Sequence, residues 1–134
     1  MKFSYSAGYK YQLKSSYSFK TGFRLHYPIA SDFIRLYIDG ELLILKGYAW
    51  DGPSGPAIDT PSFMQASLVH DALYQLMREG RMPLECRKDA DVLLYDIARQ
   101  DGMWYIRAMW TYWAVRRFAK SAITDKKKII RAGR

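Results

Sequence analysis

A glycine- and proline-rich segment from Gly47 to Pro61 divides this chain into two halves with different hydrophobic patterns. Glycines and prolines recur so closely in it that neither a helix nor a strand can run through. Apolar and polar residues alternate before the segment, as in strands, whereas apolar residues after it recur at helical spacing. Strands followed by helices predict an α+β fold, with strands in residues 1–49, a loop over 47–61 and helices over 61–121.

The clearest strand signal is a hairpin in residues 33–45. Two apolar runs, 33–38 and 41–45, are joined by Asp39-Gly40. An Asp-Gly pair supplies the positive φ angles of a tight turn, so we predict an antiparallel hairpin. Residues 5–23 alternate more loosely and are expected to add further antiparallel strands.

Three helices are expected in the second half. The first begins at Pro61, after the N-cap candidate Thr60, and ends before Gly80. The second runs from about 83 to 100 and the third from about 103 to 121. The third helix has more aromatic surface than one core-facing side needs. That surface either covers the sheet or contacts a partner or a membrane interface.

Composition limits the class of protein. A chain of 134 residues can form one domain with its own core, and 49% hydrophobic residues exclude a disordered polypeptide. The single cysteine, Cys86, excludes an internal disulfide framework and a cysteine-based zinc site. The single cysteine fits synthesis in a reducing cytoplasm. We find no apolar run of signal-peptide length at the N-terminus and none long enough to span a bilayer.

The net charge of +8 is unevenly distributed. Residues 116–134 contain eight basic residues and one acidic residue, Asp125, and therefore hold nearly all of the excess. Residues 1–115 are close to neutral. We predict a single domain over residues 1–121 and a basic tail over residues 122–134. Such a tail is either a solvated end or a binding segment for nucleic acid, anionic lipid or an acidic protein.

A polar cluster in the helical half is the strongest candidate for chemistry. His70 and Tyr74 are four residues apart and share one face of the first helix, and Asp71 lies on the adjacent flank. A short connection favours antiparallel helices, which lets Asp91 face His70. A carboxylate bound to one ring nitrogen fixes the imidazole tautomer and leaves the other nitrogen as a base for water. The same residues also suit a structural network that locks the helices together.

Asp71 and Asp51 are candidate ligands for a hard cation, together with backbone carbonyls of the loop 50–56. Carboxylates combined with carbonyls suit calcium better than zinc. Asp51 equally suits ordinary turn chemistry. Arg87 is expected to neutralise one carboxylate of the cluster. Three loop residues are supporting candidates without a catalytic role: Trp50, Gly52 and Ser54.

The string His-Asp-Ala-Leu-Tyr at residues 70–74 resembles the small calcium-dependent phospholipases A2. In both, the string lies on a helix, follows a glycine-rich loop and precedes an aspartate on an antiparallel helix. The resemblance implies that His70 is the general base and that Asp91 orients it. It also implies that Asp71 and carbonyls of residues 48–55 bind calcium. The loop departs from the family pattern by an extra aspartate and two prolines, and the family's disulfides are absent.

A longer pattern resembles the DUF1353 family of small bacteriophage and prophage proteins. It comprises Trp-Asp-Gly-Pro-Ser at residues 50–54, Pro61, the string at 70–74, and Arg87 followed by Ala90-Asp91. This resemblance implies a phage origin, synthesis in the bacterial host cytoplasm and incorporation in the virion. It assigns no activity.

Two classes of function remain. The first, slightly favoured because small phage proteins are often structural, is a virion or tail-associated interaction component. Its aromatic third helix would dock on other phage structural proteins, and residues 116–134 on nucleic acid or anionic lipid. The second is a phospholipase A2-like hydrolase with a catalytic group of His70, Asp91 and Tyr74. There Asp71 would hold a divalent cation that stabilises an oxyanion, and a phospholipid ester would be the substrate.

Overall fold

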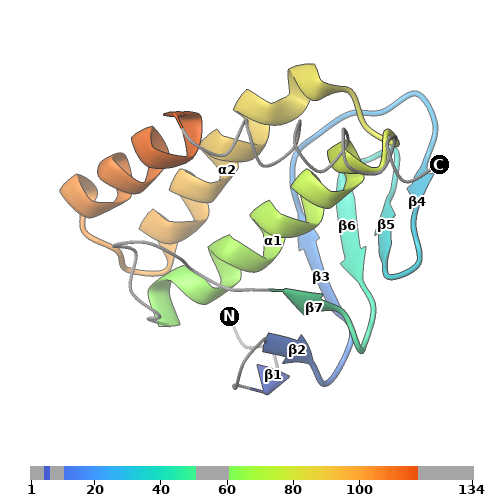
Figure 1. Cartoon of the computed structure of the whole chain (residues 1–134), viewed down its shortest axis with the longest axis horizontal. Helices are drawn as coiled ribbons and strands as arrows, with labels where there is room; N and C mark the ends of the chain where they lie inside the picture. Colours follow the sequence, from blue (N-terminus) through green and yellow to red (C-terminus); the bar gives the residue numbers. More distant parts are fainter. Residues whose placement is uncertain (1–4, 7–10, 51–60, 118–134) are drawn as a thin grey trace, which may run out of the picture. The chain divides into compact units, whose positions relative to one another are not determined.

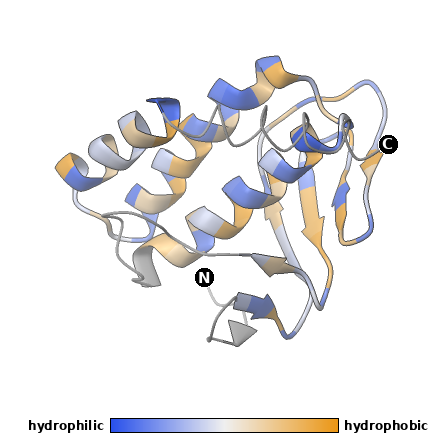
Figure 2. Cartoon of the chain, viewed as in Figure 1, coloured by the Kyte–Doolittle hydropathy of each residue, from blue (hydrophilic) through white to orange (hydrophobic). Residues whose placement is uncertain are grey.

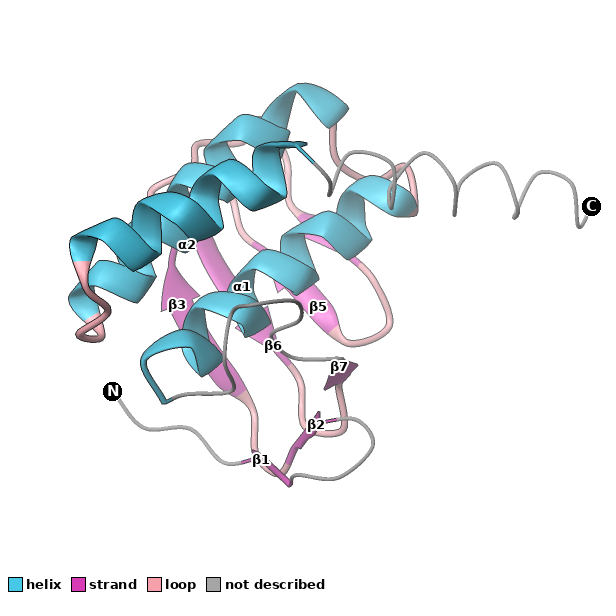
Figure 3. Ribbon diagram, turned by 60° about the vertical axis from the view of Figure 1, so that its left-hand side comes forward, coloured by secondary structure: helices cyan, strands magenta, loops and turns pink. Residues whose placement is uncertain are grey.

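The structure, a computed structural model, describes residues 5–6, 11–50 and 61–117. The chain divides into two compact units, Met1–Asp59 and Thr60–Arg134. All described strands belong to the first unit and all described helices to the second (Figures 1 and 3). The predicted α+β class, with antiparallel strands before three helices, is confirmed. Loop residues 51–60 and the predicted basic tail lie outside the described residues.

Seven described strands form two antiparallel sheets in the first unit. The three-stranded sheet has the order β1-β2-β7, formed by Tyr5–Ser6, Tyr11–Leu13 and Ala49–Trp50. The four-stranded sheet has the order β3-β6-β5-β4, formed by Tyr17–Lys20, Glu41–Ile44, Ile34–Leu36 and Ile29–Ala30. The predicted hairpin therefore lies at the centre of the larger sheet, as β5 and β6.

The hairpin is confirmed, but its turn differs from the predicted one. The Gly40 amide donates to the Tyr37 carbonyl at 2.9 Å, and the Tyr37 amide donates to Glu41 at 2.9 Å. Gly40 has a φ of 93°, whereas no described residue other than glycine has a positive φ. The loop is thus a three-residue connection that ends in a left-handed glycine, and Asp39 keeps a negative φ. A side chain at Gly40 would collide with the Phe23 carbonyl, so the position requires glycine.

The larger sheet shows the expected strand alternation. Ile34 and Leu36 of β5 are buried, and so are Leu42 and Ile44 of β6. Residues between them are more exposed, because successive side chains of a strand point to opposite faces. Figure 2 shows the hydrophobic residues that run along β6. One face of this sheet therefore supplies much of the core of the first unit.

Helix α1 (Pro61–Arg78) begins at the predicted proline and is buried on nearly all sides from residue 63 to residue 77. Gly80, with a φ of 74°, ends it. The Arg81 amide donates to Leu76 and the Gly80 amide to Met77, which is the Schellman arrangement. The predicted end of the first helix is therefore confirmed within one residue.

The second predicted helix is divided into η1 (Leu84–Cys86) and α2 (Arg87–Gln100). Pro83 is extended, with a ψ of 143°, so the regular helix begins later than predicted. Gly102 and Met103 close α2 as Gly80 and Arg81 close α1, through bonds to Arg99 and Ala98.

Residues 105–117 form the described part of the third helix, which begins slightly later than the predicted residue 103. The delay follows from the turn that closes α2. Among the described helices, none is both long and apolar enough to cross a membrane.

Candidate functional site

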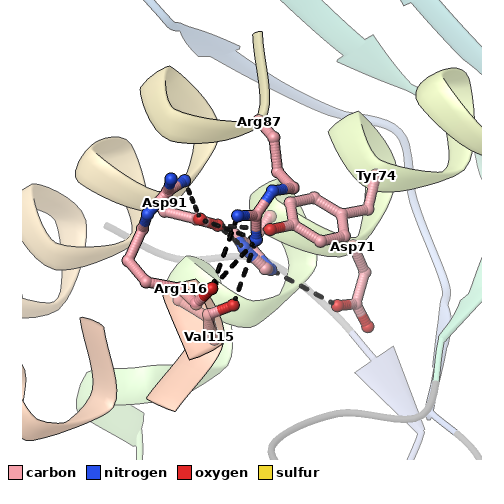
Figure 4. A network of polar contacts seen from close by, with 7 residues as sticks. Asp71, Tyr74, Arg87, Asp91, Val115 and Arg116 are labelled. Atoms are coloured by element: carbon pink, nitrogen blue, oxygen red, sulfur yellow. Dashed lines mark hydrogen bonds and ion pairs between the residues drawn. The ribbon is translucent and has the colours of Figure 1, made fainter. Parts of the chain in front are cut away.

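The predicted polar cluster forms within the second unit, where α1 and α2 run antiparallel. Gln65 bonds to Asp101 at 2.8 Å near one end of the pair, and His70 meets Asp91 farther along. The rings of His70 and Tyr74 lie against each other on one face of α1, tilted by 35° and with centroids 4.1 Å apart. Figure 4 shows Tyr74, Arg87 and Arg116 around Asp91. The structure therefore brings together three residues that the sequence predicts as a group.

Asp91 is the centre of the network, and its side chain is completely buried. Its Oδ1 atom lies 2.7 Å from Nε2 of His70 and accepts a hydrogen bond of 2.6 Å from the Tyr74 hydroxyl. Its Oδ2 atom accepts from Nη1 of Arg116 at 2.9 Å, and Nη1 of Arg87 lies 3.7 Å away. A buried carboxylate needs such compensation, because losing its hydration costs several kcal/mol.

These contacts fix the tautomer of neutral His70. An ionised carboxylate can only accept hydrogen bonds, so the ring proton is on Nε2, facing Asp91. The Nδ1 atom then carries a lone pair. Among the described residues, the carboxylate oxygen closest to it is Oδ1 of Asp71, 3.9 Å away, which is beyond hydrogen-bonding distance. Within the described part of the chain, Nδ1 of His70 is therefore a proton acceptor without a donor, on a side chain that is 7% exposed.

The pKa values of the three central groups agree with this arrangement. Burial acts to raise the pKa of Asp91, but hydrogen bonds from His70, Tyr74 and Arg116 hold it below the usual 3.8. Burial acts to lower the pKa of His70, but Asp71 and Asp91 together raise it above 6.5. Burial and Asp91 raise the pKa of Tyr74, so its hydroxyl remains a donor. Asp91 is thus ionised at neutral pH and stabilises a protonated His70.

Two arginines connect the network to the third helix. Arg116 comes from that helix and reaches Asp91 directly. Arg87 begins α2 and donates to the backbone carbonyls of Val115 and Arg116, each at 3.4 Å. The prediction that Arg87 neutralises a carboxylate is consistent with its distance from Asp91. Sequence reasoning missed Arg116, which it counted among the charges that lead into the basic tail.

Asp71 lies at the opposite end of the network from Arg116 (Figure 4). Its side chain is 35% exposed, so it can reach a solvent-borne ligand more readily than Asp91 can. Among the described residues, no group of three or more His, Cys, Asp or Glu side chains could hold a metal ion. Asp51 lies outside the described residues, so the calcium site stays a prediction.

Of the three supporting loop residues, the structure describes Trp50. Gly52 and Ser54 lie outside the described residues. Trp50 ends β7 in the first unit, where its ring contacts those of Tyr11 and Tyr48, at 5.6 Å and 6.4 Å between centroids. It serves there as a buried core residue.

No protein-family model matches this chain, and comparisons with curated proteins and with solved structures give no match. The two resemblances drawn from the sequence therefore stay predictions. The geometry of the cluster is the main basis for a functional proposal. It offers an oriented imidazole with one nitrogen available, which suits proton abstraction from water.

Proposed function

We propose that this protein is a hydrolase in which His70 is the general base and Asp91 orients it. The contact that carries the proposal is the 2.7 Å distance between Nε2 of His70 and Oδ1 of Asp91. This contact holds the ring in one orientation and directs its Nδ1 atom away from the buried carboxylate. Tyr74 is a positioning residue, because it binds the same oxygen of Asp91.

The chemistry follows from the protonation states. Nδ1 of His70 accepts a proton from water as the water oxygen bonds to the carbonyl carbon of an ester. The bond to the leaving alcohol then breaks, and the proton passes from Nδ1 to the alcohol oxygen. Asp91 stabilises the imidazolium that exists between these two transfers. Its own pKa is low, so it remains ionised throughout.

Calcium is the cation that the resemblance to phospholipases A2 implies. Asp71 is the one proposed carboxylate ligand within the described residues, and its partly exposed side chain suits a hard cation. A bound calcium ion would supply charge stabilisation for the oxyanion of the reaction. The same resemblance implies a phospholipid ester as the substrate.

Hydrolysis by single variants tests the proposal. Purified full-length chain is incubated with phospholipid vesicles and, separately, with a soluble short-chain ester, both with calcium. We expect His70→Gln to lower the rate about 100-fold or more, since general-base catalysis contributes on that order. His26→Gln is the matched control, because His26 is an exposed histidine of the first unit. Equal activity in the folded His70→Gln variant would contradict the proposal.

A second candidate is an interaction component of a phage particle, in which the cluster is structural. The observation that favours it is the pair of arginines on Oδ2 of Asp91. They let one buried carboxylate join α1, α2 and the third helix. Absence of hydrolysis by the folded wild-type chain, together with strong destabilisation in Asp91 variants, would support this candidate.

A further inference from the structure

The third helix carries its largest apolar side chains on the outside. Ile106 is 76% exposed, Trp110 is 50% exposed and Trp113 is 62% exposed. The small residues Ala108 and Thr111 of the same helix are buried. A helix that covers a core normally shows the reverse distribution, with large apolar residues inside. The core of the second unit therefore does not account for this surface.

The exposed residues form one stripe. Ile106, Trp110, Trp113 and Arg117 follow each other at intervals of four, three and four residues. Such spacing places all four on one face of a helix. The stripe is apolar along most of its length and ends in a positive charge.

The charged residues of the third helix itself are all basic. No acidic residue occurs between Met103 and Arg117, whereas Arg107, Arg116 and Arg117 are basic. Arg116 binds Asp91, and Arg107 is only partly exposed, with its Nη2 atom buried, so the exposed Arg117 brings positive charge to the stripe. The sequence continues with further basic residues through position 134. An apolar, tryptophan-rich stripe that ends in a positive charge has the chemistry of an interfacial membrane helix.

We propose that this face of the third helix docks on an anionic lipid surface. Indole rings prefer the boundary between headgroups and acyl chains, and arginines attract anionic headgroups. A second copy of the chain is a poorer occupant, because it would bring its own arginines and a net charge of +8 to the same contact. The proposal rests on the exposed stripe alone and holds whether or not His70 is catalytic.

Vesicle binding by the full-length chain tests the docking face. The probes are vesicles of phosphatidylglycerol and of phosphatidylcholine, with sedimentation and tryptophan fluorescence as readouts. We expect binding to phosphatidylglycerol with a blue shift of the emission, weaker binding to phosphatidylcholine, and weakening by salt. The double variant Trp110→Ala/Trp113→Ala should lower the partition coefficient at least about tenfold, because two indole rings leave the interface.

One control variant and one further variant of the stripe keep this result specific. Tyr27→Ala removes an aromatic side chain that is 74% exposed in the first unit, and it should leave vesicle binding unchanged. Ile106→Ser tests the stripe without loss of a fluorophore, and it should weaken sedimentation with phosphatidylglycerol vesicles. Both variants change exposed residues, so their circular dichroism should match that of the wild type.

Three results would overturn the docking proposal. The first is no sedimentation with phosphatidylglycerol vesicles, and the second is equal binding by the folded double variant. The third is a dimer that the double variant abolishes, in a chain that does not bind vesicles, which would assign the stripe to a second copy. Hydrolysis of a soluble ester by a chain that fails to bind vesicles would overturn this proposal alone. It would leave the proposed function intact.

Discussion

Nε2 of His70 and Oδ1 of Asp91 lie 2.7 Å apart, although the two residues belong to different helices and are separated by 21 positions. The contact joins a fully buried carboxylate to an imidazole that keeps a second ring nitrogen. Asp91 is completely buried, yet His70, Tyr74 and Arg116 bind its two oxygens. His70 consequently has one nitrogen fixed in a network and the other available. Each of these properties can be tested by changing one partner.

Removal of the central carboxylate should destabilise the protein strongly. Asp91→Ala leaves the Arg116 and Arg87 guanidinium groups and the Tyr74 hydroxyl without their common partner. Breaking a buried pair in this way typically costs about 3–5 kcal/mol. We expect a loss of that order in the free energy of unfolding, measured by urea denaturation. Asp96→Ala, at an exposed position of the same helix, should change it by no more than about 0.5 kcal/mol. Equal effects of the two substitutions would contradict the central role of Asp91.

The parts of the site that were predictable depend on short-range geometry. The helical repeat alone places His70 and Tyr74 on one face. The position of Asp91 opposite His70 was also predictable, because the few residues between Gly80 and Arg87 force the second helix to run back along the first. Arg116 lacks such a signal. Its position depends on a second reversal after α2 and on the rotation of the third helix, which the sequence does not specify.

The fold shows the same division between local and non-local information. The alternation of β5 and β6 and the proline at the start of α1 are local signals, and the elements they predict are confirmed. Asp39-Gly40 is compatible with more than one hairpin turn, and the structure uses the three-residue form. The crowding between Gly40 and Phe23 arises from a distant segment, so no local rule could reveal it.

Substitution of Arg116 should affect both stability and the titration of His70. Arg116→Gln removes the 2.9 Å contact to Oδ2 of Asp91, while Arg87 remains 3.7 Å away. Loss of a charged hydrogen bond of this kind costs about 1.5–3 kcal/mol, and partial exposure of Arg116 places the expected loss near the lower value. The less neutralised Asp91 should also raise the pKa of His70, which an NMR titration of the His70 ring protons measures.

Lys88→Gln is the matched control for Arg116→Gln, because Lys88 is an exposed cation of α2. It should alter neither the unfolding free energy nor the His70 titration appreciably. If Arg116→Gln left the His70 pKa unchanged while Lys88→Gln shifted it, distant charges of the protein would determine the pKa of His70. The direct contact to Asp91 would then have no electrostatic role.

The stability of the protein should depend on pH through His70 in a definite direction. Its pKa in the folded protein is raised above the usual 6.5, so the folded state binds the proton more tightly than the unfolded state does. The resulting stabilisation is fully present below pH 6.5 and is lost as the pH rises through the folded pKa. Asp91 acts oppositely: its pKa lies below 3.8, so its contribution is present above that pH and is lost in stronger acid.

These directions predict how a variant should behave. The stability difference between the wild type and His70→Gln should be larger below pH 6.5 than well above it. Urea denaturation across this range measures the difference, and His26→Gln provides the comparison at an exposed histidine. A difference that stays constant with pH would show that the proton affinity of His70 is the same in the folded and unfolded states.

Calcium should stabilise the protein through Asp71 if the proposed hydrolase binds this ion. A ligand that binds only the folded state raises the melting temperature in proportion to the logarithm of its concentration at saturating levels. We therefore expect calcium to raise the melting temperature of the wild type, and Asp71→Asn to abolish the increase. Asp71 is partly exposed, so the substitution itself should cost little stability. Asp96→Asn is the matched control, since it removes an exposed carboxylate from α2 and should retain the full response. An equal increase in both variants would show that calcium binds at a site other than Asp71. No increase in the wild type would remove calcium from the proposed reaction, and the His70–Asp91 pair would then be tested without calcium.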